Sequence, residues 1–204
     1  MATAKQRSDA VRARQAGKIK AILQTKRNPL DIESVSNCNA CINLSADHVP
    51  SEGDPQARIM LVGQSPGATE RDRGRPFVGA SGELVDQMLF ETGIRREDVY
   101  ITNALKCKPP GNRKGHPTEL NLCRKIWLSH ELKSVNPEIL ILVGKDAHQS
   151  IVGDKFPFKH CRSVKGASGR TYLSIYHPAY YIRRGVIVDF VMSVSEKLKE
   201  LLGE

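Results

Sequence analysis

The 204-residue sequence lacks the long apolar runs that membrane-spanning proteins need. No stretch approaches the ~18 consecutive apolar residues that cross a bilayer, and no apolar core of the signal-peptide kind lies near its start. The 5 cysteines are an odd set that cannot pair completely. This disfavours a disulfide scaffold and suits a metal site in a reducing cytoplasm.

Acidic residues are scarce in the first 27 positions, where Asp9 alone faces eight lysines and arginines. This segment carries +7 of the net charge of +9, because the rest of the chain holds 23 Lys and Arg against 21 Asp and Glu. Such an arm predicts contact with nucleic acid, or with a protein partner. A solvated helix or disordered tail has the same composition, and an organellar transit peptide ranks last. We expect a basic arm or helix over residues 1–30 and one globular domain over residues 31–204.

Beyond the arm, short apolar runs alternate with amphipathic segments. The apolar runs predict strands over residues 59–62, 99–102, 139–143 and 172–175. The amphipathic segments predict helices around 84–94 and over 118–135, 145–151 and 186–202. Strands that are apolar on both faces are typical of a mainly parallel sheet between helical layers, so we expect a four-stranded, three-layer αβα sandwich.

Chemically distinctive residues follow each predicted strand. The glycine-rich segment 63–67 follows the first strand, Asn103 the second, Gly144 the third and His177 the fourth. Because ligands of such sheets bind beyond the carboxyl ends of the strands, these residues are expected at one site.

Four cysteines have spacings typical of a metal site. Cys38 and Cys41 are separated by two residues, and Cys107 and Cys123 by fifteen. Four thiolates suit Zn²⁺ or an iron–sulfur cluster, which would join the N-terminal loop to the loop after the second strand. Four unrelated thiols are the alternative. Cys161 has no spaced partner and is interpreted as an ordinary thiol.

Taken together, these motifs resemble the family 4, iron–sulfur uracil-DNA glycosylases of the wider uracil-DNA glycosylase superfamily. The similarity runs from about Cys38 to Arg184. Its parts are Cys38-x-x-Cys41, Gly63-Gln64-Ser65-Pro66-Gly67, Gly74-Arg75-Pro76-Phe77-Val78-Gly79, Ile101-Thr102-Asn103, Lys106-Cys107-Lys108-Pro109-Pro110, Asn112-Arg113, Cys123 and His177-Pro178.

The resemblance implies a DNA repair hydrolase that flips uracil out of single- or double-stranded DNA and cuts its glycosidic bond, leaving an abasic site. It also implies a monomer with a structural [4Fe–4S] cluster held by Cys38, Cys41, Cys107 and Cys123, zinc being the minor alternative. The expected location is the cytoplasm of a bacterial, archaeal or phage-infected cell, with no membrane contact.

The expected substrate site consists of Gly63, Gln64, Ser65, Phe77, Asn103 and His177. His177 would donate a hydrogen bond to the uracil carbonyl oxygen that gains charge as the base departs. Asn103 would match the uracil O4 acceptor and N3–H donor, a pattern that cytosine reverses. The ring of Phe77 would stack on the flipped base.

The expected DNA-binding residues lie on either side of this site. After His177, the segment with Tyr180, Arg183 and Arg184 resembles the superfamily's minor-groove loop. Arg113 would bind phosphate, and Lys106 and Lys108 would extend that surface.

Two positions depart from the family 4 pattern. The chain has Gln64 where the family usually has Glu, and Arg71 where it usually has Asp. No general base is obvious, so water would be positioned by Gln64 and main-chain groups, while Glu70 and Asp72 are interpreted as acids of a solvated loop. The alternative function is a weakly active or non-catalytic module that binds uracil or DNA and partners a repair or replication complex.

Overall fold

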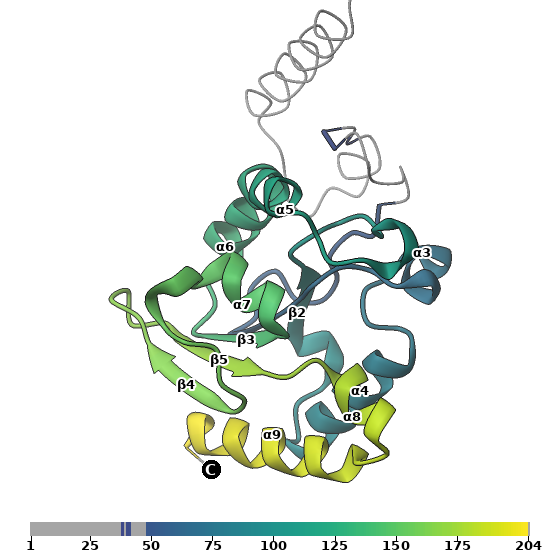
Figure 1. The fold of residues 1–204 in the computed structure, drawn as a ribbon. Helices are drawn as coiled ribbons and strands as arrows, with labels where there is room; N and C mark the ends of the chain where they lie inside the picture. Colours follow the sequence, from purple (N-terminus) through teal and green to yellow (C-terminus); the bar gives the residue numbers. More distant parts are fainter. Residues whose placement is uncertain (1–37, 39, 42–47, 204) are drawn as a thin grey trace, which may run out of the picture.

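The computed structural model describes residues 38, 40, 41 and 48–203. The predicted basic arm over residues 1–30 lies outside this part of the chain. The described part contains a sheet of five strands in the order β2-β1-β3-β5-β4 (Figure 1). Their bounds are β1 Ile59–Gly63, β2 Val99–Asn103, β3 Ile139–Val143, β4 Arg162–Lys165 and β5 Thr171–Ile175. The four predicted strands pair in parallel, and β4 adds an antiparallel edge.

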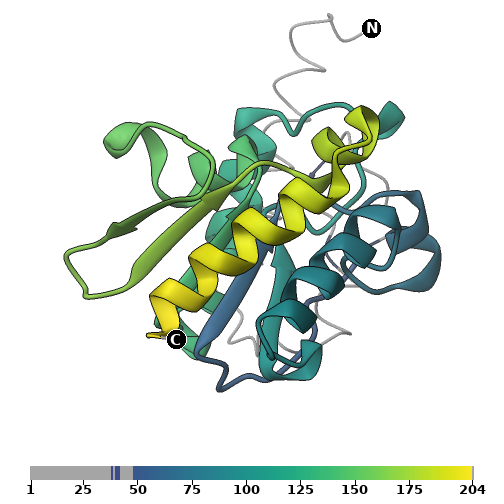
Figure 2. The same ribbon diagram turned by 90° about the horizontal axis from the view of Figure 1, so that it is seen from below.

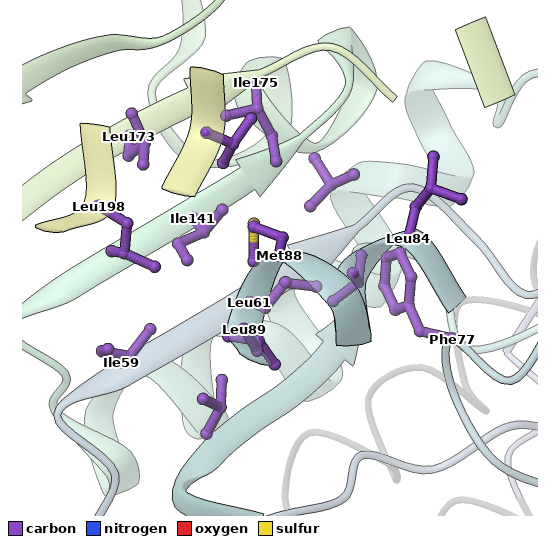
Figure 3. Close-up of a cluster of buried hydrophobic side chains, with 14 of the residues drawn as sticks. Ile59, Leu61, Phe77, Leu84, Met88, Leu89, Ile141, Leu173, Ile175 and Leu198 are labelled. Carbon is purple, nitrogen blue, oxygen red and sulfur yellow. The ribbon is translucent and has the colours of Figure 1, made fainter. Parts of the chain in front are cut away.

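One face of the sheet packs against three helices (Figures 1 and 2). They are α4 (Ala80–Glu91), α8 (Pro178–Arg184) and α9 (Ile187–Leu202). Alternate strand residues such as Leu61 and Ile141 meet Met88 of α4 and Leu198 of α9 in one buried cluster (Figure 3). The amphipathic pattern of the sequence therefore produces this layer, because each helix turns its apolar face to the sheet.

The opposite face packs against α5 (Pro117–Cys123), α6 (Ser129–Val135) and α7 (Lys145–Ile151). Met60 and Leu140 point to this side because successive strand residues alternate between faces. Helices α5 and α6 correspond to the single predicted helix over 118–135, which a π-helical turn over Arg124–Leu128 divides. The predicted αβα sandwich is confirmed.

Several short elements were not predicted from the sequence. They are α3 (Ala68–Arg73), α8, β4 and the 3₁₀ turns Arg96–Asp98, Pro110–Asn112 and Gly153–Lys155. The antiparallel edge strand β4 contains four residues, with Arg162 and Lys165 exposed. At the other edge, Glu52 forms a bridge with Ile101 of β2 through two backbone hydrogen bonds of 3.0 and 2.8 Å. Within the described residues, no helix has the length and apolarity to cross a membrane.

Candidate active site

A cavity of about 520 Å³ lies at the carboxyl ends of the parallel strands. Its walls come from the loop after β1, the loop before α4, the end of β2 and the start of α8. The residues that the sequence predicted and that line it are Gln64, Ser65, Phe77, Asn103, His177 and Arg183. Glu70 and Asn112 also line it. The predicted convergence of these segments is therefore present in the fold.

Gly63 determines where two other site residues can lie. In the parallel register, Gly63 of β1 is paired with Asn103 of β2, so both strands end at the same level. A Cβ atom on residue 63 would lie 2.2 Å from Oδ1 of Asn103 and 2.5 Å from Cζ of Phe77. Real Cβ atoms do not approach so closely, so glycine allows both side chains to reach the cavity.

The side-chain amide of Asn103 is open to the cavity. The residue is 3% exposed, and among the described residues none forms a hydrogen bond with its side chain. An amide offers one acceptor and a pair of donors. A buried amide of this kind gains from a ligand that supplies the complementary donor and acceptor, as the uracil edge does.

Phe77 is held in an uncommon conformation at the cavity. Its φ of +50° lies in the left-handed region, which bulky residues rarely adopt. The side chain is 6% exposed and lies beside Leu84 in the core (Figure 3). Nη2 of Arg96 donates a 2.7 Å hydrogen bond to the carbonyl of Pro76, which fixes the preceding peptide. The conformation is thus maintained by packing and by this cation.

Glu70 joins the two loops that form one wall of the cavity. Its carboxylate accepts backbone hydrogen bonds from Gly67 at 3.0 Å, Val78 at 3.0 Å and Gly79 at 2.7 Å. The interpretation of Glu70 as an acid of a solvated loop is therefore wrong, because both of its oxygens are engaged by amides. Asp72 is exposed and pairs with Arg71 at 2.7 Å. Among the described lining residues, Glu70 is the only carboxylate, so no lining carboxylate is free to act as a base.

His177 caps the N-terminus of α8 and enters the cavity from its side. Its Nδ1 accepts a 3.2 Å hydrogen bond from the backbone N–H of Ala179. A neutral ring with an accepting Nδ1 carries its proton on Nε2, which leaves an N–H donor for a ligand. Burial lowers the pKa of His177, Arg183 lowers it further and Glu70 acts in the opposite direction. The ring is therefore neutral at neutral pH.

Gly144 was expected at the same edge, and it lies behind His177 rather than in the cavity lining. A Cβ atom on this glycine would lie 3.5 Å from Cβ of His177. Its φ of +91° also favours glycine. The loop after β3 thus supports the histidine from behind.

The predicted DNA-contact residues fall in different environments. Arg183 is exposed at the rim of the cavity, and the guanidinium of Arg184 lies 4.6 Å from the ring centre of Tyr180. Arg113 forms two hydrogen bonds, of 2.9 and 2.7 Å, with the carboxylate of Glu119.

Lys106 contradicts its predicted place on the phosphate-binding surface. Its side chain is 1% exposed and its Nζ lies 2.6 Å from Oε1 of Glu131, a residue of α6 that is itself fully buried. It also donates to the hydroxyl of Thr102. A buried cation requires such partners, and no local pattern in the sequence indicates that Glu131 is one.

The four cysteines of the predicted metal site lie together at one corner. The thiols of Cys38, Cys41 and Cys123 interact electrostatically, and Cys107 forms a bridge with His48, which is hydrogen-bonded to Cys38. Cys107 and Cys123 are buried, Cys38 and Cys41 are half-buried, and Cys38 and Cys123 contact a small apolar cluster around Trp127. Burial raises the pKa of Cys41 to about 11 and that of Cys123 to about 12, with a further rise from neighbouring thiols.

Cys38 differs from these two thiols. Burial raises its pKa, but hydrogen bonds from His48, the Ala40 backbone and Trp127 outweigh this and lower it overall. Soft thiol donors gathered in one corner suit an iron–sulfur cluster or zinc. As the described side chains lie, however, no group of three or more His, Cys, Asp or Glu encloses a metal position.

Cys161 lies away from this corner. Its Sγ is 3.3 Å from Nε2 of His160, and burial raises the pKa of the thiol. A neutral, half-buried thiol agrees with its interpretation as an ordinary cysteine.

Comparison with known proteins agrees with this arrangement. The uracil DNA glycosylase superfamily model matches residues 50–189. A type-4 uracil-DNA glycosylase of Archaeoglobus fulgidus is 34% identical over 186 residues, which cover 85% of this chain and 92% of that protein. One from Thermotoga maritima is 38% identical over 177 residues, covering 83% and 92%. A type-5 uracil-DNA glycosylase of Thermus thermophilus is 36% identical over 151 residues, covering 63% and 68%. The predicted resemblance is confirmed, and the chain belongs to the uracil-DNA glycosylase superfamily.

Proposed function

We propose that this protein is a monofunctional uracil-DNA glycosylase, which removes uracil from single- and double-stranded DNA and leaves an abasic site. One observation carries the proposal: the open amide of Asn103 and the Nε2–H donor of His177 line the same cavity at the carboxyl edge of the sheet. The type-4 and type-5 relatives support the same activity by name.

The reaction breaks the bond between C1′ of the sugar and N1 of uracil. The bonding electron pair leaves with the base, so negative charge gathers on the uracil ring while positive charge develops on the sugar. His177 donates its Nε2–H to the carbonyl oxygen that receives this charge. Asn103 pairs with the O4 and N3–H of uracil, and Phe77 stacks on the ring. Cytosine would leave the amide of Asn103 unpaired.

Water completes the reaction by adding hydroxide to C1′ and releasing a proton to the base or solvent. Gln64 and the main chain near Ser65 are proposed to position this water, since both residues line the cavity. The engagement of Glu70 with three amides favours a second candidate function, a slow or non-catalytic module that binds uracil in DNA.

Cys38, Cys41, Cys107 and Cys123 are proposed to hold a [4Fe–4S] cluster, with zinc as the minor alternative. Their thiol chemistry and common location fit such a group. When bound, the cluster would supply structure rather than reactivity, by joining the loop after β2 to α5 and to the chain before residue 48.

The substrate is proposed to be uracil-containing DNA, bound by a monomer in the cytoplasm. Arg183 at the rim and Arg184 beyond it are the proposed phosphate contacts. Arg113, Lys108 and the basic arm would extend this surface, and the arm would also serve any protein partner.

The proposed reaction is tested by incubating purified protein with uracil-containing single-stranded and duplex oligonucleotides. Products are resolved on a denaturing gel with and without alkali. Strand cleavage that depends on alkali is expected, and Asn103→Ala should reduce it at least tenfold because one buried polar partner is lost. If metal-loaded wild-type protein left the DNA intact, the proposed glycosylase activity would be overturned. The second candidate function, a module that binds uracil in DNA, would then be favoured.

The proposed cluster is tested by replacing Cys107 with serine and measuring iron, acid-labile sulfide and zinc in purified protein. Wild-type protein is expected to contain iron and sulfide, while Cys107→Ser should lose most of both and unfold at lower temperature. Cys161→Ser is the matched control and should retain the wild-type content. If the wild-type protein contained zinc and no sulfide, the four cysteines would be assigned to a zinc site instead of a cluster.

A further inference from the structure

A second hollow lies on the other side of α8 from the candidate active site. It has a volume of about 680 Å³, and its lining includes His160, Tyr176, Tyr180, Arg184 and Asp189. Helix α8 contributes Ala179 and Arg183 to the active-site cavity, and Tyr180, Tyr181 and Arg184 to this aromatic groove. The two cavities share no lining residue, so the groove is a separate surface beside the first.

The aromatic groove has a fixed structure. The rings of His160 and Tyr176 are stacked, with centres 5.0 Å apart and planes 8° apart. Tyr180 is 5.2 Å from Tyr176. His160 is held at both ring nitrogens, since Nδ1 accepts from the backbone of Tyr176 at 3.0 Å and Nε2 lies 2.9 Å from the hydroxyl of Tyr181. The rings are therefore positioned before any ligand arrives.

Of these rings, Tyr176 is exposed, while His160 and Tyr180 are half-buried. Tyr176 is 39% exposed, an unusual value for a large aromatic residue in a fold whose other tyrosines are buried or half-buried within the described part of the chain. Arg184 lies over the ring of Tyr180 and supplies a cation at the groove. Exposed aromatic faces with a neighbouring arginine are the elements that bind unstacked nucleobases.

The charges in and around the groove distinguish a base from a phosphate. Asp189 lines the groove and would repel a phosphate placed inside it. A carboxylate instead accepts hydrogen bonds from the N–H groups of base edges. Arg184 lines the groove, and the exposed residues Lys159 and Arg162 lie close to His160 in the sequence. These cations suit a DNA backbone whose phosphates pass outside the groove.

We propose that the aromatic groove binds one unstacked nucleobase of the same DNA strand that places its uracil in the active site. This inference rests on the proposed function, because the position of the bound base is counted from a uracil in the active site. A helix is about 10–12 Å wide, and successive nucleotides of one strand are about 3.4 Å apart along the duplex axis. Because an unstacked strand is more extended than a duplex strand, the groove is expected to receive a base within about three nucleotides of the uracil.

The first test measures binding without uracil, so that it does not depend on the glycosylase reaction. Fluorescence anisotropy compares a uracil-free single strand with a base-free strand of equal length and phosphate number. Wild-type protein is expected to bind the base-bearing strand about tenfold more tightly, and Tyr176→Ala should lose most of this preference. Tyr176→Phe should retain it, as should Phe90→Ala, which removes an aromatic residue that is 80% exposed on α4.

The second test locates the base relative to uracil. Single strands carry 2′-fluoro-2′-deoxyuridine, which resists cleavage, and an abasic spacer at each flanking position in turn. Wild-type affinity is expected to fall about tenfold at one position within about three nucleotides of the uracil, and the Tyr176→Ala profile should be flat.

The outcomes separate this inference from the proposed function. Intact DNA in the excision assay described above would overturn the proposed function, while the first test still decides whether the groove binds bases. Equal binding of the base-bearing strand by wild type and Tyr176→Ala would overturn the proposal that the groove binds a base. Uracil excision combined with a flat wild-type spacer profile would also overturn the proposal that the groove binds a base.

Discussion

Replacement of His177 by alanine is expected to slow uracil excision about 100- to 1,000-fold under single-turnover conditions. This is the usual cost of removing one hydrogen-bond donor from the atom that gains charge in the transition state. The Nε2–H of His177 is assigned to that role because Nδ1 is occupied by the amide of Ala179. Rates are measured on a single-stranded substrate with protein in excess. His130→Ala, which removes an exposed histidine of α6, is the control and should leave the rate unchanged.

The pH dependence of excision provides an independent check on the same histidine. Burial lowers the pKa of His177 from its ordinary value of about 6.5, so the ring stays neutral as the pH falls to that value. The contribution of His177 to the rate should therefore be constant from pH 8 to about 6.5. It should decline only below that pH, where a proton on Nδ1 breaks the hydrogen bond from Ala179 that orients the ring. Because the folded chain disfavours the cation, stability should also decrease as the pH falls below about 6.5. A decline in the rate that begins above pH 7 and disappears in His177→Ala would contradict a neutral donor.

Replacement of Gly63 by alanine is expected to reduce excision at least about 100-fold, because misplacement of reacting groups by about 1 Å has that effect. The new methyl group would meet Oδ1 of Asn103 at 2.2 Å and the ring of Phe77 at 2.5 Å, so both must move. Crowding of this kind also destabilises a fold by about 1–3 kcal/mol. Single-turnover rates and thermal unfolding are measured together.

Gly166→Ala is the matched control for this substitution. A Cβ atom there would meet Cε2 of Tyr172 at 2.7 Å, in the hairpin between β4 and β5 and outside the cavity lining. This variant should unfold at lower temperature while its excision rate stays within a factor of two. If Gly63→Ala excised uracil at the wild-type rate, Asn103 and Phe77 would not be held by this glycine.

Much of the fold follows from local sequence pattern. The buried strands are short runs such as Ile139–Val143, in which every residue is apolar, and parallel pairing brings their ends together. Once that edge was predicted, Asn103 and His177 were expected at the same edge, since Asn103 ends β2 and His177 lies two residues after β5. How near they lie depends on strand order, which the sequence pattern did not predict: β1 and β3 separate their strands, and both residues line one cavity.

Tertiary partners explain what the sequence did not predict. Lys106 appears in the sequence as one of several lysines near Cys107, and its burial depends on Glu131, 25 residues further along the chain. Glu70 lies among exposed charges, and its role depends on amides contributed by residues 78 and 79. The strand Arg162–Lys165 has two charged residues out of four, and β5 provides the pairing that makes it a strand.

The two edges of the sheet have a consequence for the behaviour of the protein at high concentration. An edge strand with unpaired backbone groups invites addition of a strand from another molecule, which leads to aggregation. Here the bridge of Glu52 to Ile101 occupies part of the outer edge of β2, and β4 is short with lysine and arginine exposed. Both features discourage intermolecular strand pairing, so the folded chain is expected to remain dispersed in concentrated solution even though its central strands are strongly apolar.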